Sequence, residues 1–83
     1  MQYKIFLTSK AEKQYKNLIK HNNKLRLQLD NAITDLQFFQ GDIIKLTDNA
    51  NNYRLRTGNY RILFKLESDI IYIGQIVDRK EAY

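Results

Sequence analysis

Cysteine and proline are absent from the 83-residue sequence, and histidine occurs once, at His21. Without cysteine the chain can form neither a disulfide framework nor a thiolate metal site, and a reducing cytoplasm is its expected compartment. A single histidine also gives little support to a metal site or a Ser-His-Asp triad. We therefore expect no metal and no cofactor, and we expect His21 to be a solvated residue at a helix end.

Long apolar runs are absent too. The N-terminal stretch MQYKIFLTSK has too short an apolar segment for the core of a signal peptide, and no other run approaches membrane-spanning length. No repeat, linker or low-complexity tract divides the sequence. Residues 1–83 are therefore expected to form a single soluble domain without membrane contact.

Positive charge exceeds negative charge. The net charge is +5 and the pI is about 9.6. From Lys4 to Arg26 there are seven lysines and arginines and one acid, Glu12. This balance favours an anionic partner such as nucleic acid or an acidic protein. Much of the lysine charge is equally well explained as the solvated face of a helix, so charge alone leaves the partner open.

The first half of the chain predicts a strand followed by two helices. Residues 2–8 alternate between two faces, which is typical of a strand. Ser9 and Glu12 form a capping-box pattern at the start of a helix over about Lys10–Lys20. Its apolar positions fall at helical spacing, and its lysines occupy the other side.

A second helix is expected over about Lys24–Phe39. Asn22 or Asn23 can cap its start, and Gly41 ends it. A loop follows, with a short extended piece at Ile43–Leu46. The apolar stripe of this helix consists of Leu25, Leu29, Ala32, Ile33, Leu36 and Phe39.

The second half predicts three strands in succession, over Tyr53–Thr57, Tyr60–Leu66 and Ile70–Val77. The last is apolar at nearly every position, which is typical of an interior strand covered on both faces. The element order therefore indicates an α+β fold with an N-terminal strand, a helical hairpin, and an antiparallel β-meander packed on the helices.

Three arginines are predicted to share one face of this meander. A two-residue turn at Gly58 and Asn59 places Arg56 directly opposite Arg61, with Arg54 on the same face. Like charges directly opposite each other destabilise a strand pair by something within about 0.2–1 kcal/mol. Because guanidinium groups match phosphate oxygens at two points, we interpret this arrangement as a cradle for a polyanion.

A structural interpretation of the arginines also remains. They can pair with Glu67, Asp69 or Asp78 on neighbouring strands, or a three-residue turn can change the register. The closing segment IVDRKEAY places Arg79 where the last strand leaves the sheet, followed by Lys80 and Tyr83.

The motifs YRLR, GNYR and RKEAY, spaced along the sheet of a small basic chain, resemble those of the RelE/ParE superfamily of bacterial toxins. The resemblance covers essentially the whole chain and implies the RelE-like fold. It also implies the toxin component of a type II toxin-antitoxin system, in the RelE-like branch. Members of that branch are ribosome-dependent endoribonucleases that cleave mRNA in the A site by attack of the 2'-hydroxyl on the phosphodiester.

The resemblance also implies roles for individual residues. Arg54 and Arg56 would hold the phosphate and stabilise its extra charge in the transition state, and Arg61 would grip the same phosphate. Tyr83 would accept the proton of the 2'-hydroxyl, and Arg79 would stabilise the leaving 5' oxygen. Lys80 joins the three hairpin arginines in binding RNA.

Three positions differ from the usual family pattern. Relatives often have lysine at one or both positions of Arg54 and Arg56, and many have histidine at the position of Asp78.

The partners that the family implies are a cognate antitoxin protein, the ribosome and mRNA. The alternative within the same fold is a ParE-like toxin that inhibits DNA gyrase by binding, although such relatives generally lack the combined arginine and tyrosine set.

Overall fold

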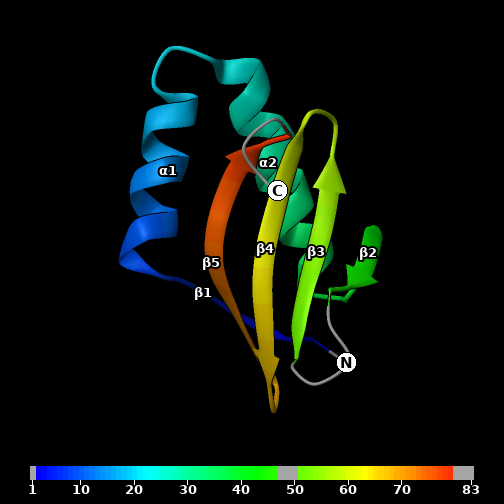
Figure 1. Cartoon of the computed structure of the whole chain (residues 1–83). Helices are drawn as coiled ribbons and strands as arrows, with labels where there is room; N and C mark the ends of the chain where they lie inside the picture. The colour runs from blue at the N-terminus through cyan, green and yellow to red at the C-terminus, as the bar shows by residue number, and fades with distance from the viewer. Residues whose placement is uncertain (1, 47–50, 80–83) are drawn as a thin grey trace.

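The computed structural model describes residues 2–46 and 51–79, which form five strands and two helices. The sheet has the order β1-β5-β4-β3-β2, and the helices pack against one of its faces (Figure 1). The expected α+β fold is therefore confirmed. In chain order the elements are β1 (Lys4–Leu7), α1 (Ser9–Ile19), α2 (Asn23–Leu36), β2 (Asp42–Lys45), β3 (Asn52–Thr57), β4 (Tyr60–Glu67) and β5 (Ile70–Asp78).

Strands β2 to β5 form antiparallel pairs, as the meander predicts. β1 differs, because it runs parallel to β5, with Lys4 beside Ile70. The sheet is therefore mixed, and β5 lies in its interior between β1 and β4, which confirms the expected position of that strand. Strand β2 forms the opposite edge and corresponds to the expected extended piece after the second helix.

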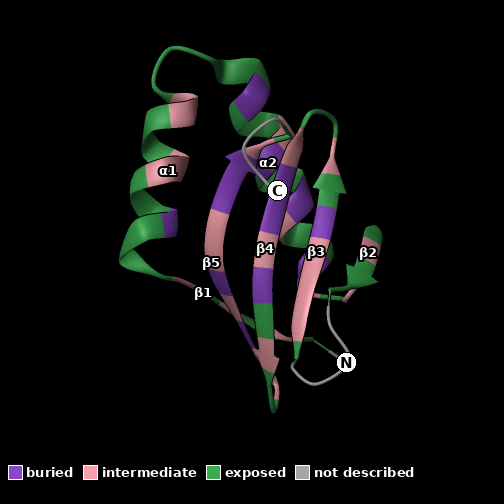
Figure 2. Cartoon of the chain, viewed as in Figure 1, coloured by how far each residue is buried: buried purple, intermediate pink, exposed green. Residues whose placement is uncertain are grey.

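The prediction that β5 is covered on both faces was wrong. Ile71 and Ile73 are fully buried against the helices, whereas Tyr72 and Gln75 on the other face are half-buried (Figure 2). The pairing with β4 shifts by one residue at Gly74, which forms a β-bulge. The bulge resets the alternation of the strand. Residues after it can therefore return to the core side despite their odd spacing.

Helix α1 starts one residue earlier than predicted. Thr8, rather than Ser9, is its N-cap, and the Thr8 hydroxyl accepts a hydrogen bond from the backbone N–H of Ala11 at 3.2 Å. The same hydroxyl donates to the carbonyl of Gly74 at 3.2 Å. The cap therefore ties the start of the helix to β5, a contact that a local capping pattern does not reveal.

Helix α2 is capped by Asn22, as one of the two predicted options, and ends at Leu36 rather than at Phe39. Its end is a Schellman motif, in which the N–H of Gln40 donates to the carbonyl of Asp35 and the N–H of Phe39 donates to that of Leu36. Phe39 takes the left-handed conformation usually filled by glycine, with φ of 52°.

Aromatic packing stabilises this conformation of Phe39. Its ring lies 5.8 Å from that of Tyr3, 5.5 Å from that of Tyr53 and 6.1 Å from that of Phe64. Aromatic pairs contribute about 0.5–1.5 kcal/mol each beyond the area they bury, which offsets the strain of the backbone. The helix end, β1 and the hairpin of β3 and β4 therefore meet at one aromatic cluster.

The remaining core lies between the helices and the sheet. No helix among the described residues is long and apolar enough to cross a membrane. The buried apolar residues of the core cluster are Ala11, Leu25, Leu29, Ala32, Leu36, Leu55, Ile62, Phe64, Ile71, Ile73 and Ile76.

One polar contact joins the two helices, and it predicts a pH-dependent stability. The hydroxyl of Tyr15 donates a hydrogen bond to the carboxylate of Asp30, and this bond raises the pKa of Tyr15 above its ordinary value of 10.0. We expect Tyr15→Phe to lower the free energy of unfolding at pH 7 by about 0.5–1 kcal/mol, a small value because both groups are exposed to solvent.

The contribution of Tyr15 has a defined pH window. Because its pKa is higher in the folded state, the stabilisation is fully present below about pH 10 and is lost as the pH rises through the raised value. Urea denaturation of both proteins at pH 7 and pH 11 measures the difference. A difference that stays constant or grows at pH 11 would contradict the assignment.

Candidate functional site

The candidate site is built on the hairpin of β3 and β4. Its turn is Gly58 and Asn59, and φ is positive at Gly58 and not at Asn59, the pattern of a type II' turn. As predicted, Arg56 lies directly opposite Arg61 and Arg54 lies opposite Leu63. The register inferred from a two-residue turn is confirmed, and the three-residue alternative is excluded.

The turn is also fixed by a helix. The side-chain amide of Gln28 in α2 donates to the carbonyl of Thr57 at 2.9 Å. The φ of 58° at Gly58 favours glycine, and a Cβ there would lie 2.6 Å from the amide nitrogen of Gln28, so a side chain would displace the amide that holds the turn. The hairpin that carries the arginines is thereby anchored to the helical layer.

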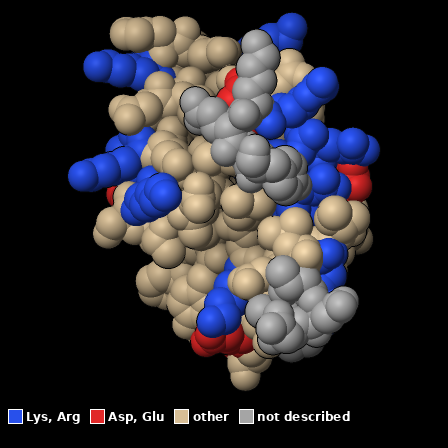
Figure 3. All heavy atoms as spheres, viewed as in Figure 1, with Lys and Arg blue, Asp and Glu red and all other residues tan. Residues whose placement is uncertain are grey.

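Alternation along the two strands places the arginines on the sheet face opposite the helices, here called the open face. Leu55 and Ile62, which alternate with them, are buried in the core. Lysine and arginine side chains gather over the turn end of β3 and β4 (Figure 3). The sequence-based assignment of Arg54, Arg56 and Arg61 to one face is therefore confirmed.

An acid at the sheet edge pairs with two of these arginines. Asp42 on β2 lies opposite Arg56, and the Nε of Arg56 is 2.6 Å from the carboxylate of Asp42. The Nη2 of Arg54 lies 4.0 Å from the other carboxylate oxygen. Asp42 was not among the partners expected from sequence, whereas one expected partner, Glu67, pairs with Lys65 at 3.2 Å.

The ion pair with Asp42 is exposed, with side-chain exposures of 53% for Arg56 and 42% for Asp42. Exposed pairs contribute at most about 1 kcal/mol, because water screens the attraction. Asp42 therefore orients the two guanidinium groups without holding them tightly. The sequence predicted a short extended piece after Gly41, but it did not identify the strand with which that piece pairs.

Among the described residues, Arg61 is the one charged residue that is buried, with 7% of its surface exposed. Its Nη1 donates to the carbonyls of Tyr60 at 3.1 Å and Gly58 at 3.4 Å. The Nε donors of Arg61 and Arg54 are buried and have no hydrogen-bond partner within residues 2–46 and 51–79. An unpaired buried donor costs about 1–3 kcal/mol, so both arginines favour an acceptor on the open face.

Arg79 reaches the same end of the sheet. It follows β5 directly, and its backbone N–H donates to the carbonyl of Asn59 at 2.7 Å. The expectation that Arg79 emerges where the last strand leaves the sheet is confirmed, and the structure places it beside the hairpin turn. We call Arg54, Arg56, Arg61 and Arg79 the arginine cluster. The remaining candidates, Lys80 and Tyr83, lie outside the described residues.

The arginine cluster suits a phosphodiester ligand. Guanidinium groups keep their charge at any physiological pH and can donate two parallel hydrogen bonds to phosphate oxygens. Within residues 2–46 and 51–79 no group of three or more potential ligands could hold a metal ion. His21 lies exposed in the turn after α1, as expected of a solvated residue.

The first comparison with known proteins is by sequence. No family model matches the chain. The chain is 38% identical over 56 residues to Toxin RelE3 of Methanocaldococcus jannaschii. The match covers 68% of this chain and spans 60% of the length of that relative.

Solved structures share the fold over nearly the whole chain. The RelB-RelE antitoxin-toxin complex from Methanococcus jannaschii matches with a TM-score of 0.71 and 24% identity, over 94% of this chain and 98% of that one. The E. coli DinJ-YafQ toxin-antitoxin complex matches with a TM-score of 0.77 and 13% identity, over 100% and 99% of the two chains.

A third structure, the YoeB dimer from Staphylococcus aureus, has a TM-score of 0.71 and 17% identity, and the match covers 90% of this chain and 94% of that one. At these identities the structures establish the shared fold, and the match to the archaeal toxin adds similarity in sequence. The chain therefore has the fold of RelE-type toxins, and across 60% of the length of Toxin RelE3 it is also similar to that protein in sequence.

Proposed function

We propose that the protein is the toxin of a type II toxin-antitoxin system and acts as a ribosome-dependent endoribonuclease on mRNA in the A site. The observation that carries the proposal is that Arg54, Arg56 and Arg61 share the open face, with the backbone of Arg79 held at the hairpin turn. A hairpin with arginine opposite arginine is not favoured by folding alone. Binding of a phosphodiester supplies a reason for the arrangement.

The proposed reaction uses the RNA as its own nucleophile. The 2'-hydroxyl oxygen attacks the adjacent phosphorus, the bond from phosphorus to the 5' oxygen breaks, and a 2',3'-cyclic phosphate and a 5'-hydroxyl are formed. Negative charge grows on the phosphate oxygens during this step. Preorganised positive groups lower its barrier because they stabilise the transition state more than the ground state.

Arg54, Arg56 and Arg61 are the groups proposed to bind this phosphate. Arg61 is already fixed by its two backbone acceptors, so it needs little reorganisation when the substrate binds. Arg56 must exchange its contact with Asp42 for a phosphate oxygen. That exchange is favourable because the ion pair is exposed and weak, whereas the phosphate brings more than one acceptor.

The proton transfers are assigned to residues near the end of the sequence. Tyr83 is proposed to accept the proton of the 2'-hydroxyl. A free tyrosine has a pKa near 10, so about one molecule in a thousand is phenolate at pH 7, and arginines close to a phenol favour its ionised form. Arg79 is proposed to stabilise the leaving 5' oxygen, which takes its proton from water, because a guanidinium group is a poor proton donor. Lys80 is proposed to bind RNA.

A cognate antitoxin is the proposed protein partner. The structures of the shared fold include complexes described as RelB-RelE, DinJ-YafQ and YoeB-YefM. Acidic side chains of such a partner could occupy the arginine cluster, as Asp42 already does for Arg56. Inhibition would then follow from competition with the phosphate of the substrate.

Substitution of Arg56 separates binding from folding. We expect Arg56→Leu to reduce cleavage about a hundredfold, the loss typical of one transition-state donor. Its free energy of unfolding should change by less than about 1 kcal/mol, because the loss of the exposed pair with Asp42 is offset by relief of repulsion with Arg61. Cleavage in a purified translation system and urea denaturation measure the two effects.

The matched control is Arg26→Leu, which removes the same charge from the exposed surface of α2. This variant should cleave like the wild type. Equal loss of cleavage in both variants would indicate that net charge, rather than the arginine cluster, is responsible. A loss of several kcal/mol in Arg56→Leu would show that this arginine is a structural residue.

Primer extension on translated mRNA tests the reaction itself. After a pulse of the wild-type protein we expect new 5' ends within translated regions, and we expect Tyr83→Phe to reduce them strongly because the phenol is the proposed proton acceptor. Growth arrest without new ends would instead favour the ParE-like alternative, in which gyrase is inhibited by binding.

A further inference from the structure

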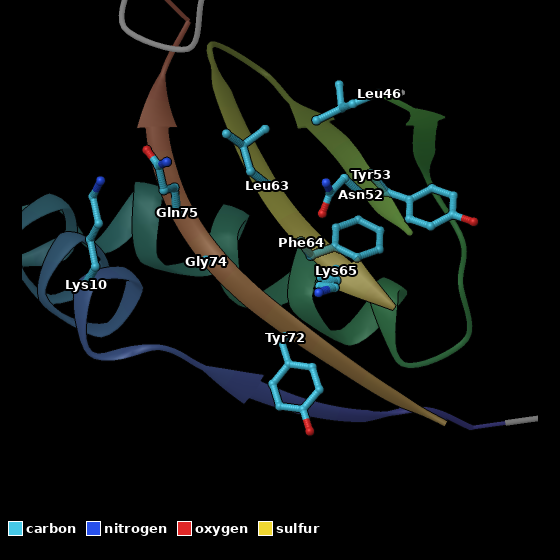
Figure 4. Close-up of a pocket in the computed structure, with 10 residues that line it drawn as sticks. All are labelled: Lys10, Leu46, Asn52, Tyr53, Leu63, Phe64, Lys65, Tyr72, Gly74 and Gln75. Atoms are coloured by element: carbon cyan, nitrogen blue, oxygen red, sulfur yellow. The ribbon is translucent and has the colours of Figure 1, made fainter. Parts of the chain in front are cut away.

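The open face contains a hollow next to the arginine cluster. Its volume is about 330 Å³, and Figure 4 shows the residues that line it. Leu63 and Lys65 of β4 and Tyr72, Gly74 and Gln75 of β5 form its middle, and Lys10 at the start of α1 stands at one side. Apolar surface predominates in this lining, and polar groups stand at its rim.

The hollow adjoins the proposed phosphate site through Leu63. Leu63, in its wall, lies directly opposite Arg54 and two positions after Arg61. Uncharged side chains cover much of the visible middle of this face, and lysines and arginines stand around it (Figure 3). A ligand that crosses from the cluster into the hollow therefore meets positive charge first, then apolar surface, and then the ammonium group of Lys10, whereas the ammonium group of Lys65 pairs with Glu67. Alternating charge and apolar surface match the backbone and the bases of a nucleic acid.

Gly74 creates part of this space without being required by the backbone. Its φ is not in the left-handed region, and a Cβ added there would meet only the carbonyl oxygen of Leu63, at 3.9 Å. In contrast to Gly58, a side chain at this position is sterically allowed. Glycine usually weakens a strand, so its presence here is explained by the room it leaves in the hollow.

Two aromatic rings extend the hollow toward β1. Phe6 lies beside Tyr72 in the parallel pair, with ring centroids 6.0 Å apart and an angle of 33° between the planes. Phe6 is 61% exposed, unusual for a phenylalanine. Unstacked bases bind on aromatic faces of this kind, and amide groups such as those of Gln75 and Asn52 can hydrogen-bond to base edges.

We propose that the hollow binds an unstacked base of a single-stranded RNA, with Tyr72 as its stacking surface. The proposal rests on the proposed function, because it takes the RNA to be the strand whose phosphate lies at the arginine cluster. A nucleotide is favoured over a protein side chain because positive charge borders the hollow both at the cluster and at Lys10.

The test compares two probes that differ in their bases. One is a fluorescein-labelled 2'-O-methyl hexa-adenylate, which cannot be cleaved, and the other is an abasic strand of the same length and charge. At low salt we expect the wild type to bind the adenylate about ten- to hundredfold more tightly than the abasic strand, as one stacked base contributes. Fluorescence anisotropy gives both dissociation constants.

Two variants identify the place where the base binds. Gly74→Leu fills the hollow and Tyr72→Leu removes the stacking surface, so each should abolish the preference for the adenylate and leave abasic binding unchanged. Phe38→Leu, which removes an exposed aromatic ring in the turn after α2, is the matched control and should retain the preference. Gly74→Leu should melt at or above the wild-type temperature because glycine is not required there.

The outcomes separate this proposal from the proposed function. Equal binding of both probes by the wild type, or a preference that survives in Gly74→Leu and Tyr72→Leu, overturns the base site and leaves the phosphate site intact. A hollow that serves a protein partner would give this result. Absence of binding to either probe also overturns it. Loss of cleavage in Arg56→Leu with wild-type cleavage in both hollow variants would support the proposed function and show that cleavage does not need the base site.

Discussion

The register of the β3 and β4 hairpin is the constraint on which the candidate site depends. A slip by one residue would turn the arginines toward the helices and expose Leu55 and Ile62. Burial of those apolar side chains therefore fixes the position of the charges on the other face. The turn at Gly58 receives a hydrogen bond from Gln28 on one side, and Arg79 contacts the turn from β5.

The hairpin could be predicted because its information is local. A Gly-Asn pair between alternating strands specifies both the turn and every cross-strand pair after it. The apolar stripe of α2 and the cap at Asn22 are local in the same sense, and both agree with the structure. Local signals also set the arginines on one face, so much of the candidate site followed from the sequence.

The features that could not be predicted arise from contacts distant in sequence. Thr8 rather than Ser9 caps α1, because the hydroxyl of Thr8 also donates a hydrogen bond to the carbonyl of Gly74. The ion pair of Asp42 with Arg56 exists because β2 pairs along β3, which no turn between them specifies. The hollow depends on the bulge at Gly74, and an apolar strand pattern alone suggested full coverage of β5 instead.

The parallel pairing of β1 with β5 determines the stage of synthesis at which the open face can form. These strands come from nearly opposite ends of the described chain, and β5 supplies three of the fully buried core residues, Ile71, Ile73 and Ile76. Pairing over such a separation is slow and must follow synthesis of both strands. During translation, the nascent chain therefore lacks both the interior strand and the arginine that follows it. A folded open face becomes available only after β5 has left the ribosome that makes it.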